Sequence, residues 1–278
     1  ALNNSFQAKI EGMPAEMIQA LAVEEYENFV ELLQDAGIEV LEFEDLPHTP
    51  DAVFPNNWFS TFPDKQLLTY PMFSKIRRGE RRADILQLLT EQSDYKLNKE
   101  LENLEEENIF LEGTGSLVLD HSKKLAFAAL SPRTSPEALE AFSKLTGYEV
   151  IDFTAVGPAG EPIYHTNVMI CVGDNFALVG FDTIFEEDHD KIRAALKGKT
   201  IIELSNDQVY NHFAGNMLGL QNQQGRRFLV MSAAAKRSLS NEQKATIRSL
   251  KLQIIAPALS IIETIGGGSA RCMLAELF

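Results

Sequence analysis

The feature that most constrains the fold of this 278-residue chain is an order of elements that recurs about every 50–60 residues. Two short apolar runs flank a polar turn, a stretch with helical spacing follows, and a third apolar run ends each unit. The clearest hairpin pairs runs 168–172 and 176–179 around Gly173-Asp174-Asn175. Recurrence at this period favours one repeat architecture over separate domains. No Pro/Gly/Ser-rich linker interrupts the series, so we predict a single α/β domain over residues 1–278, with room for about five units.

The spacing of apolar residues and the turn residues predict the individual elements. Ser135 and Pro136 have the residue types of an N-cap and a first helical position. The predicted helices are 15–36, 80–93, 135–147, 188–197, 206–218 and 240–249. The predicted hairpins pair 58–62 with 66–70, 117–119 with 125–128, and 168–172 with 176–179, and single strands are expected at 38–43, 148–153, 200–204, 228–231 and 252–256.

The charge balance argues against several classes of partner. The chain has 40 acidic and 25 basic residues, which disfavours nonspecific binding to nucleic acid or to an anionic membrane. No apolar run reaches the roughly 18–20 residues that span a bilayer, and no signal peptide is visible. The two cysteines form no disulfide framework, so a cytoplasmic setting is expected. The chain starts without an initiator methionine and stops after Phe278, and we expect the first and last segments of the domain to be missing.

A glycine-rich segment carries the strongest signal for chemistry. Gly266-Gly267-Gly268 permits backbone geometry that other residues resist and lets a ligand approach the main chain. Cys272 follows, and its thiol is a candidate nucleophile if Arg271 or a histidine stabilises the thiolate. The alternative is a glycine turn with a buried cysteine. A phosphate-binding loop is disfavoured because the Lys-Ser/Thr ending is absent. Cys171, within an apolar run, is predicted to fill the core.

Two further segments carry residues suited to acid–base chemistry. His165 lies in Tyr164-His165-Thr166-Asn167 directly before an apolar strand, where it could act as a general base or be a structural histidine. Glu112 follows the apolar run 109–111 and precedes glycines, so its carboxylate could reach into a cavity or lie in a solvated turn. The histidines show no metal-ligand spacing, and no metal is predicted.

Amide and basic side chains supply candidate binding groups. Phe54-Pro55-Asn56-Asn57-Trp58-Phe59 places two amides between aromatic residues, where they could hydrogen-bond a polar ligand or form a turn. Arg77-Arg78-Gly79-Glu80-Arg81-Arg82 is the basic cluster of the sequence. In an acidic chain it could hold a ligand carboxylate, and a solvated helix start is the alternative.

In this order, the segments resemble the guanidino-group-modifying superfamily, the pentein fold, over nearly the whole chain. Glu112-Gly113-Thr114-Gly115 is similar to the family's Glu-Gly-Gly-Asp segment, His165-Thr166-Asn167 to its His-x-Asp, and residues 266–272 to its C-terminal nucleophile loop. Arg77-Arg78-Gly79-Glu80 and Ser131-Pro132-Arg133-Thr134 look like its two arginine-bearing segments. The combination looks closest to the bacterial branch described as citrulline-utilisation hydrolases.

The resemblance implies a five-bladed α/β propeller of pseudo-fivefold ββαβ repeats, and a C–N hydrolase without a cofactor. Cys272 would be the nucleophile and His165 the acid and base, while Glu112 would orient His165 or bind a substrate nitrogen. The planar head of the substrate would be held by amides, and its amino-acid carboxylate by arginines. The expected substrate-binding residues are Phe54, Asn57, Asn167, Arg78 and Arg133.

The chain departs from the family at acidic positions. Asn57 and Asn167 stand where guanidinium-binding members usually carry acidic residues, and Gly115 replaces the Asp of Glu-Gly-Gly-Asp. Burying a guanidinium without a carboxylate is costly, whereas an amide can pair with both the N–H groups and the oxygen of a urea. We therefore predict that free citrulline is cleaved to ornithine, ammonia and carbon dioxide through a covalent Cys272 intermediate.

Other functions are also compatible with the sequence. On the same scaffold, the chain could deiminate arginine or a methylated arginine, as a dimethylargininase does, or transfer an amidino group. A non-catalytic pentein that only binds a ligand is an alternative of another class, and a cysteine protease or amidase on an unrelated fold is disfavoured by the repeat. The expected partner is a free amino acid, with a homodimer as a further option.

Overall fold

The computed structural model describes residues 6–46 and 48–278, and this part of the chain contains four three-stranded sheets. In each sheet an antiparallel hairpin is followed by a helix and by a third strand parallel to the second. The sheets consist of β1 (Phe59–Thr61), β2 (Gln66–Thr69) and β3 (Lys96–Asn98); β4 (Leu117–Asp120), β5 (Leu125–Ala129) and β6 (Glu149–Phe153); β7 (Ile170–Val172), β8 (Phe176–Val179) and β9 (Thr200–Glu203); β10 (Leu218–Gln221), β11 (Arg227–Val230) and β12 (Gln253–Ile255).

Helices connect the second and third strands of every sheet, and short helical turns precede several first strands. The α-helices are α1 (Ala15–Asp35), α2 (Ala83–Gln92), α3 (Gly113–Ser116), α4 (Pro136–Thr146), α5 (Glu186–Ala195), α6 (Asn206–His212), α7 (Ala233–Ser238) and α8 (Asn241–Ser249). The shorter turns are η1 (Pro55–Asn57), η2 (Arg77–Glu80), η3 (Glu100–Glu107), η4 (Thr166–Val168), η5 (Phe181–Thr183) and η6 (Ile262–Gly266). None of the helices in the described ranges is long and apolar enough to cross a membrane.

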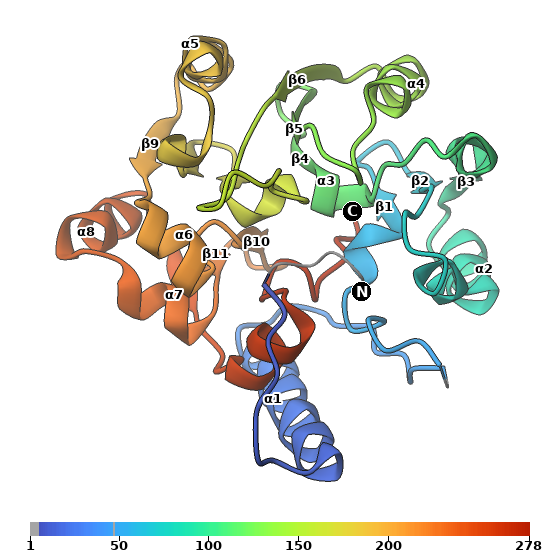
Figure 1. The fold of residues 1–278 in the computed structure, drawn as a ribbon, viewed down its shortest axis with the longest axis horizontal. Coiled ribbons are helices and arrows are strands. Elements are labelled where there is room, and N and C mark those ends of the chain that lie inside the picture. The colour runs from blue at the N-terminus through green and yellow to red at the C-terminus, as the bar shows by residue number, and fades with distance from the viewer. Residues whose placement is uncertain (1–5, 47) are drawn as a thin grey trace.

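The four sheets and α1 surround a common centre (Figure 1). Helices α2, α4, α5 and α8 lie at the rim, whereas α3 lies on the inner side of its sheet. Each rim helix buries an apolar face against its own sheet. In the second unit, Leu139 and Phe142 of α4 join Ala126 and Ala128 of β5 in one apolar cluster. This arrangement directs the segments before the first strands toward the centre.

The three predicted hairpins and most of the predicted helices are confirmed. α1, α2, α4, α5 and α8 fall within a few residues of their predicted ranges. Ser135 has the extended conformation of an N-cap, but its hydroxyl accepts a hydrogen bond from Phe110 N at 3.0 Å and not from the helix.

Two predicted elements are wrong. The helix predicted over 206–218 ends at His212, because Phe213 adopts a left-handed conformation with φ of 51°, and the chain then enters β10. The strand predicted at 38–43 belongs to no sheet. It follows α1 as a third strand would, but no hairpin precedes α1 in the described residues, so it has no strand to pair with. β3, β10 and α7 were not predicted.

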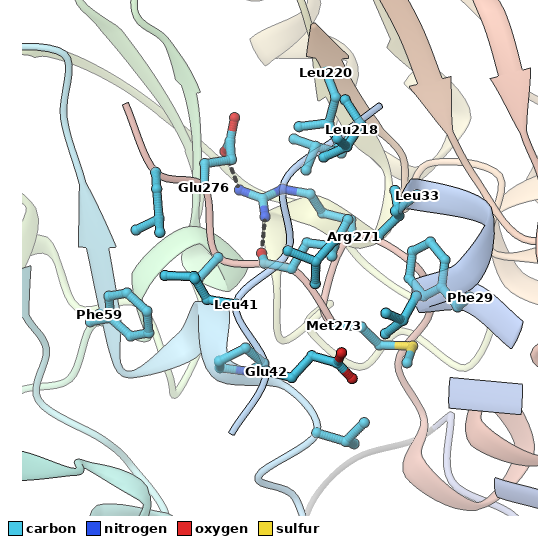
Figure 2. Close-up of a pocket in the computed structure, with 18 of the residues that line it drawn as sticks. Phe29, Leu33, Leu41, Glu42, Phe59, Leu218, Leu220, Arg271, Met273 and Glu276 are labelled. Carbon is cyan, nitrogen blue, oxygen red and sulfur yellow. Dashed lines mark hydrogen bonds and ion pairs between the residues drawn. The ribbon is translucent and has the colours of Figure 1, made fainter. Parts of the chain in front are cut away.

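A large cavity lies beside this unpaired segment. It has a volume of about 1510 Å³ and is bordered by α1, the segment after it, β10 and residues 273–278. Figure 2 shows its lining as mostly apolar side chains, among them Phe29, Leu33, Leu41 and Leu218. Leu41 is 45% exposed, which is consistent with an open apolar groove rather than a filled core.

Candidate active site

The candidate catalytic side chains come from equivalent places in successive units. Glu112 precedes α3, which leads into β4, and His165 precedes η4, which leads into β7. Asn57 ends η1, which leads into β1. The α3 turn packs against both η1 and η4, so the repeat itself brings these three residues to one place near the centre. All three side chains are buried.

Glu112 and His165 form a buried hydrogen-bonded pair. His165 Nε2 lies 2.7 Å from Glu112 Oε2, and Arg133 donates to the same oxygen at 3.2 Å. The other carboxylate oxygen accepts from Phe73 N at 3.1 Å. Burial alone would raise the pKa of Glu112, but the His165 hydrogen bond and the Arg133 charge outweigh it and hold that pKa at about 2. Glu112 is therefore an anion whose oxygens already accept three hydrogen bonds.

The carboxylate determines which imidazole nitrogen is free. An ionised carboxylate only accepts hydrogen bonds, so Nε2 of His165 carries the proton and Nδ1 presents a lone pair. Burial lowers the pKa of His165 to about 4, against the opposing effect of Glu112. The Nδ1 edge faces Gly115, where a Cβ atom would lie 2.8 Å from Nδ1 and 2.3 Å from Asn57 Nδ2. The missing side chain at 115 thus leaves space between His165 and Asn57.

Cys272 lies next to the same turn as His165. Its sulfur accepts hydrogen bonds from Asn167 Nδ2 at 3.4 Å and from Asn216 Nδ2 at 3.2 Å, and Asn167 belongs to the η4 turn that follows His165. The phenyl ring of Phe54 packs under the glycine-rich segment, where a Cβ on Gly268 would lie 2.9 Å from the ring. The structure therefore brings together Cys272, His165, Glu112, Asn57, Asn167 and Phe54.

Arg271, considered above as an activator of the thiol, points away from it. Its guanidinium donates to Leu274 O at 2.8 Å and to Glu276 Oε2 at 3.0 Å (Figure 2). Arg271 lines the large cavity, whereas Cys272, His165 and Glu112 do not. Asn167, whose amide contacts Cys272 Sγ, also lines the cavity. Cys171 is buried in β7, as predicted for a core residue, and burial raises its pKa to about 12.

Three buried asparagine side chains have polar atoms without a hydrogen-bond partner in the described part of the chain. Arg77 Nη1 donates to Asn57 Oδ1 at 2.7 Å, and because a guanidinium only donates, Asn57 Nδ2 must face Gly115. This nitrogen has no hydrogen-bond partner among the described residues, and the same holds for Asn167 Oδ1. The neighbouring Asn56 is also buried, with both polar side-chain atoms unpartnered in that range. Buried polar groups are rarely left unpaired unless a ligand or water satisfies them.

The predicted arginines lie on either side of an aromatic pair. Phe73 and Phe110 pack edge to face with their ring centres 5.2 Å apart. The Arg78 guanidinium lies 5.9 Å from the Phe110 ring, and that of Arg133 lies 6.0 Å from the Phe73 ring. Arg78 is partly exposed and donates to Met72 O at 3.0 Å. Arg133 is buried against Glu112, so one of its donors is already used by the catalytic carboxylate.

The prediction missed two buried residues of the site, Arg77 and Asn216. Arg77 is paired with Glu80 at 2.7 Å and orients Asn57, whereas the sequence singled out its neighbour Arg78. Asn216 had a recognisable signal, because it directly precedes an apolar strand as Asn57 and Asn167 do. The signal was missed because Asn216 itself fell within the predicted helix 206–218. Among residues 6–46 and 48–278, no cluster of three metal-ligating acids, histidines or cysteines occurs.

Comparisons with known proteins identify the fold and the family. No curated protein matches the sequence. The N-terminal domain of ArgZ, a cyanobacterial arginine dihydrolase solved with substrate, has a TM-score of 0.73 at 16% identity, covering 92% of this chain and 86% of that one. AgrE in complex with L-arginine gives 0.73 at 17% identity, covering 96% and 37%. A dimethylarginine dimethylaminohydrolase adduct with S-methyl-L-thiocitrulline gives 0.68 at 17% identity, covering 96% and 91%.

The chain spans about a third of the length of ArgZ in its apo structure, where it covers 35% of that chain. At these identities the structures show a shared fold. The sequence itself matches a family model described as "N,N dimethylarginine dimethylhydrolase, eukaryotic" over residues 1–278. The chain therefore belongs to this dimethylarginine dimethylhydrolase family, a family of C–N hydrolases within the guanidino-group-modifying pentein superfamily.

Proposed function

We propose that this protein hydrolyses the ureido group of free citrulline, with Cys272 as the nucleophile. The observation that carries the proposal is the unpartnered pair of amide atoms beside the catalytic groups. Asn57 Nδ2 offers a free donor and Asn167 Oδ1 a free acceptor, both buried. A ureido group presents a carbonyl oxygen that accepts and N–H groups that donate, so it matches this pair without bringing a charge.

The charge balance of the site supports a neutral head group. Glu112 is the carboxylate next to His165, and its two oxygens accept hydrogen bonds from Phe73, His165 and Arg133. Arg133 also balances its negative charge. A buried guanidinium would need a carboxylate of its own, and at the two positions where the family resemblance leads us to expect one this chain has Asn57 and Asn167.

The mechanism follows from the protonation states. His165 Nδ1 takes the thiol proton of Cys272, and the sulfur attacks the ureido carbon. The protonated His165 then delivers its proton to the ornithine nitrogen as the C–N bond breaks, leaving a carbamoyl thioester on Cys272. His165 next draws a proton from water, which attacks the thioester and restores the thiol. The released carbamic acid separates into ammonia and carbon dioxide, so citrulline and one water give ornithine, ammonia and carbon dioxide.

Glu112 supports this cycle by holding His165 in the required tautomer and by stabilising the imidazolium that forms. Arg78 and Arg133 would hold the substrate carboxylate beside the Phe73–Phe110 pair, as charge-assisted contacts. Phe54 would support the glycine-rich segment under the substrate. The fold to which these residues belong would be a five-unit propeller, in which α1 and residues 38–46 form the incomplete fifth unit.

Arginine is the second candidate substrate, and the likeness to an arginine dihydrolase favours it. In such a reaction the guanidino group would lose ammonia first and the ureido product would then follow the route above. The two candidates differ in the nitrogen released. Citrulline yields one ammonia for each ornithine, and arginine yields two.

The test is a substrate panel of citrulline, arginine and methylated arginines, with ammonia, ornithine and citrulline assayed separately. We expect citrulline to have the highest kcat/KM and equal amounts of ammonia and ornithine. Cys272→Ser should abolish turnover, while the control Cys171→Ser should retain it, because Cys171 lies in the core. Turnover of arginine or a methylated arginine above that of citrulline would reject the proposed substrate. Full activity of Cys272→Ser would reject the proposed nucleophile.

A further inference from the structure

Asn216 is a fully buried residue between α6 and β10 whose side chain bridges two parts of the site. Its Oδ1 accepts hydrogen bonds from Arg271 N at 3.0 Å and from Cys272 N at 3.4 Å. Its Nδ2 donates to Asn167 O at 3.1 Å and to Cys272 Sγ at 3.2 Å. One amide thus contacts the nucleophile segment through both of its ends.

These contacts determine the orientation of the amide. Main-chain N–H groups only donate, so the atom that faces Arg271 N and Cys272 N must be the oxygen. The nitrogen is consequently directed at the sulfur. The nitrogen's second contact, a main-chain carbonyl oxygen, requires a donor as well. All four contacts are therefore met in one orientation, and an amide with its oxygen and nitrogen exchanged would not satisfy them.

Donors aimed at a sulfur favour its anionic form. An N–H group hydrogen-bonds a thiolate more strongly than a neutral thiol, because the acceptor then carries a full charge. Cys272 Sγ receives such donors from Asn216 and Asn167. Arg271, the nearest cation in the sequence, instead binds Glu276. The amides are therefore the groups positioned to stabilise a charged sulfur.

We propose that Asn216 is a catalytic residue that stabilises the thiolate of Cys272 and holds its sulfur toward the substrate. This inference rests on the proposed role of Cys272 as nucleophile. Asn216 differs from Asn167 because neither of its polar side-chain atoms is left for a ligand. Its contribution is therefore expected in kcat and in thiol reactivity, with little change in KM.

The experiment compares Asn216→Asp with Asn216→Ala in a Cys171→Ala background. Aspartate keeps the acceptors for Arg271 N and Cys272 N but replaces the donor to sulfur with a negative oxygen. Alanine loses both. The rate of iodoacetamide alkylation at Cys272 is measured by mass spectrometry from pH 5 to pH 10 without substrate. Thermal melting and circular dichroism establish that each variant is folded.

We expect the midpoint of the alkylation profile to move up by about one pH unit or more in Asn216→Asp, and by less in Asn216→Ala. Each unit lowers the thiolate fraction at neutral pH about tenfold, and the alkylation rate at that pH should fall in proportion. If Asn216 served only as a backbone anchor, Asn216→Ala would be the damaging change and Asn216→Asp would keep the wild-type midpoint. That result would overturn the inference. If the Asp variant does not fold, an unchanged alkylation midpoint in a folded Asn216→Ala variant overturns it instead.

Asn222 provides the matched control. It is a buried asparagine whose Oδ1 accepts from Gln224 N and Arg226 N at 3.1 and 2.9 Å, and whose Nδ2 donates to Ala36 O at 2.8 Å. Asn222→Ala should leave the alkylation midpoint unchanged. Because alkylation needs no substrate, a shifted midpoint with no citrulline turnover in the wild type would reject the proposed function and leave the role of Asn216 intact.

Discussion

Gly115 departs from the family motif that the sequence resembles, and the structure gives a spatial reason for its small size. A Cβ atom at this position would lie 2.3 Å from Asn57 Nδ2 and 2.8 Å from two atoms of the His165 ring. We predict that Gly115→Ala lowers kcat/KM about 100-fold, because displacing either group by an ångström misaligns the attack. Steady-state kinetics with citrulline provide the measurement.

Gly79→Ala is the control for this change, since nothing lies within 4 Å of a Cβ built at that position. It should retain wild-type kinetics. If Gly115→Ala kept more than half of the wild-type activity, the space beside His165 would not be required for catalysis.

The pH dependence should report the buried imidazole. The pKa of His165 is lowered from 6.5 to about 4, chiefly by burial. We predict that kcat/KM stays high on acidification until about pH 4, because His165 must be neutral to accept the thiol proton. A pH–rate profile with an acid limb near 6.5 would contradict this.

The lowered pKa of His165 also makes the free energy of unfolding depend on pH. Between pH 6.5 and 4 the unfolded chain binds a proton at His165 that the folded chain does not. The contribution is therefore fully present above pH 6.5 and is lost as the pH falls toward 4. Urea unfolding of wild type and His165→Gln across this range should show the difference between them shrinking as the pH falls.

Neighbouring units are joined by a buried ion pair. Lys199, directly before β9, lies 2.8 Å from Asp120 at the end of β4, and both side chains are 2% exposed. Lys199 also donates to Gly173 O and Asp174 O at 2.8 Å. We predict that Lys199→Met destabilises the fold by about 3–5 kcal/mol, because it leaves a buried carboxylate uncompensated. Urea unfolding at neutral pH measures the change.

Lys191→Met is the comparison, since Lys191 pairs with Asp188 on the surface of α5 with 43% of its side chain exposed. It should change stability by less than about 1 kcal/mol. Equal effects of the two substitutions would show that the buried pair does not hold the units together.

Elements with strong local signals could be predicted from the sequence. The hairpin of β7 and β8 has apolar runs around a turn rich in polar residues and glycine, and Ser135-Pro136 begins α4. Elements that depend on distant partners could not. Residues 38–43 have the residue types of a strand but no strand to pair with, and Phe213 ends α6 although phenylalanine seldom adopts a left-handed conformation.

The same distinction between local signals and distant partners applies to the residues of the site. The resemblance of the motifs predicted that Cys272, His165 and Glu112 would share one site, and the structure places Glu112 and His165 within hydrogen-bonding distance. The sequence could not show that Arg77 rather than Arg78 would be buried, since that depends on Glu80 and Asn57 surrounding its guanidinium. Nor could it show that Arg271 would turn away from the thiol.

At the scale of the whole molecule, the unpaired segment 39–46 that follows α1 should be the most dynamic part. No N–H group of residues 39–46 donates a hydrogen bond within the described part of the chain, whereas β6 is paired with β5 along its length. We predict that hydrogen exchange in 39–46 is complete within seconds at neutral pH while residues of β6 stay protected. Exchange followed by mass spectrometry measures both, and slow exchange in 39–46 would mean that another strand covers this segment in solution.

The sulfur of Cys272 receives its hydrogen bonds from Asn167 and Asn216, which belong to two different units. A ribosome makes both amides before it makes the cysteine. The two amide contacts to the sulfur of Cys272 can therefore form only when the separate units have closed on one another. A copy in which the units had not closed would carry the same cysteine without the groups that hold its sulfur in place.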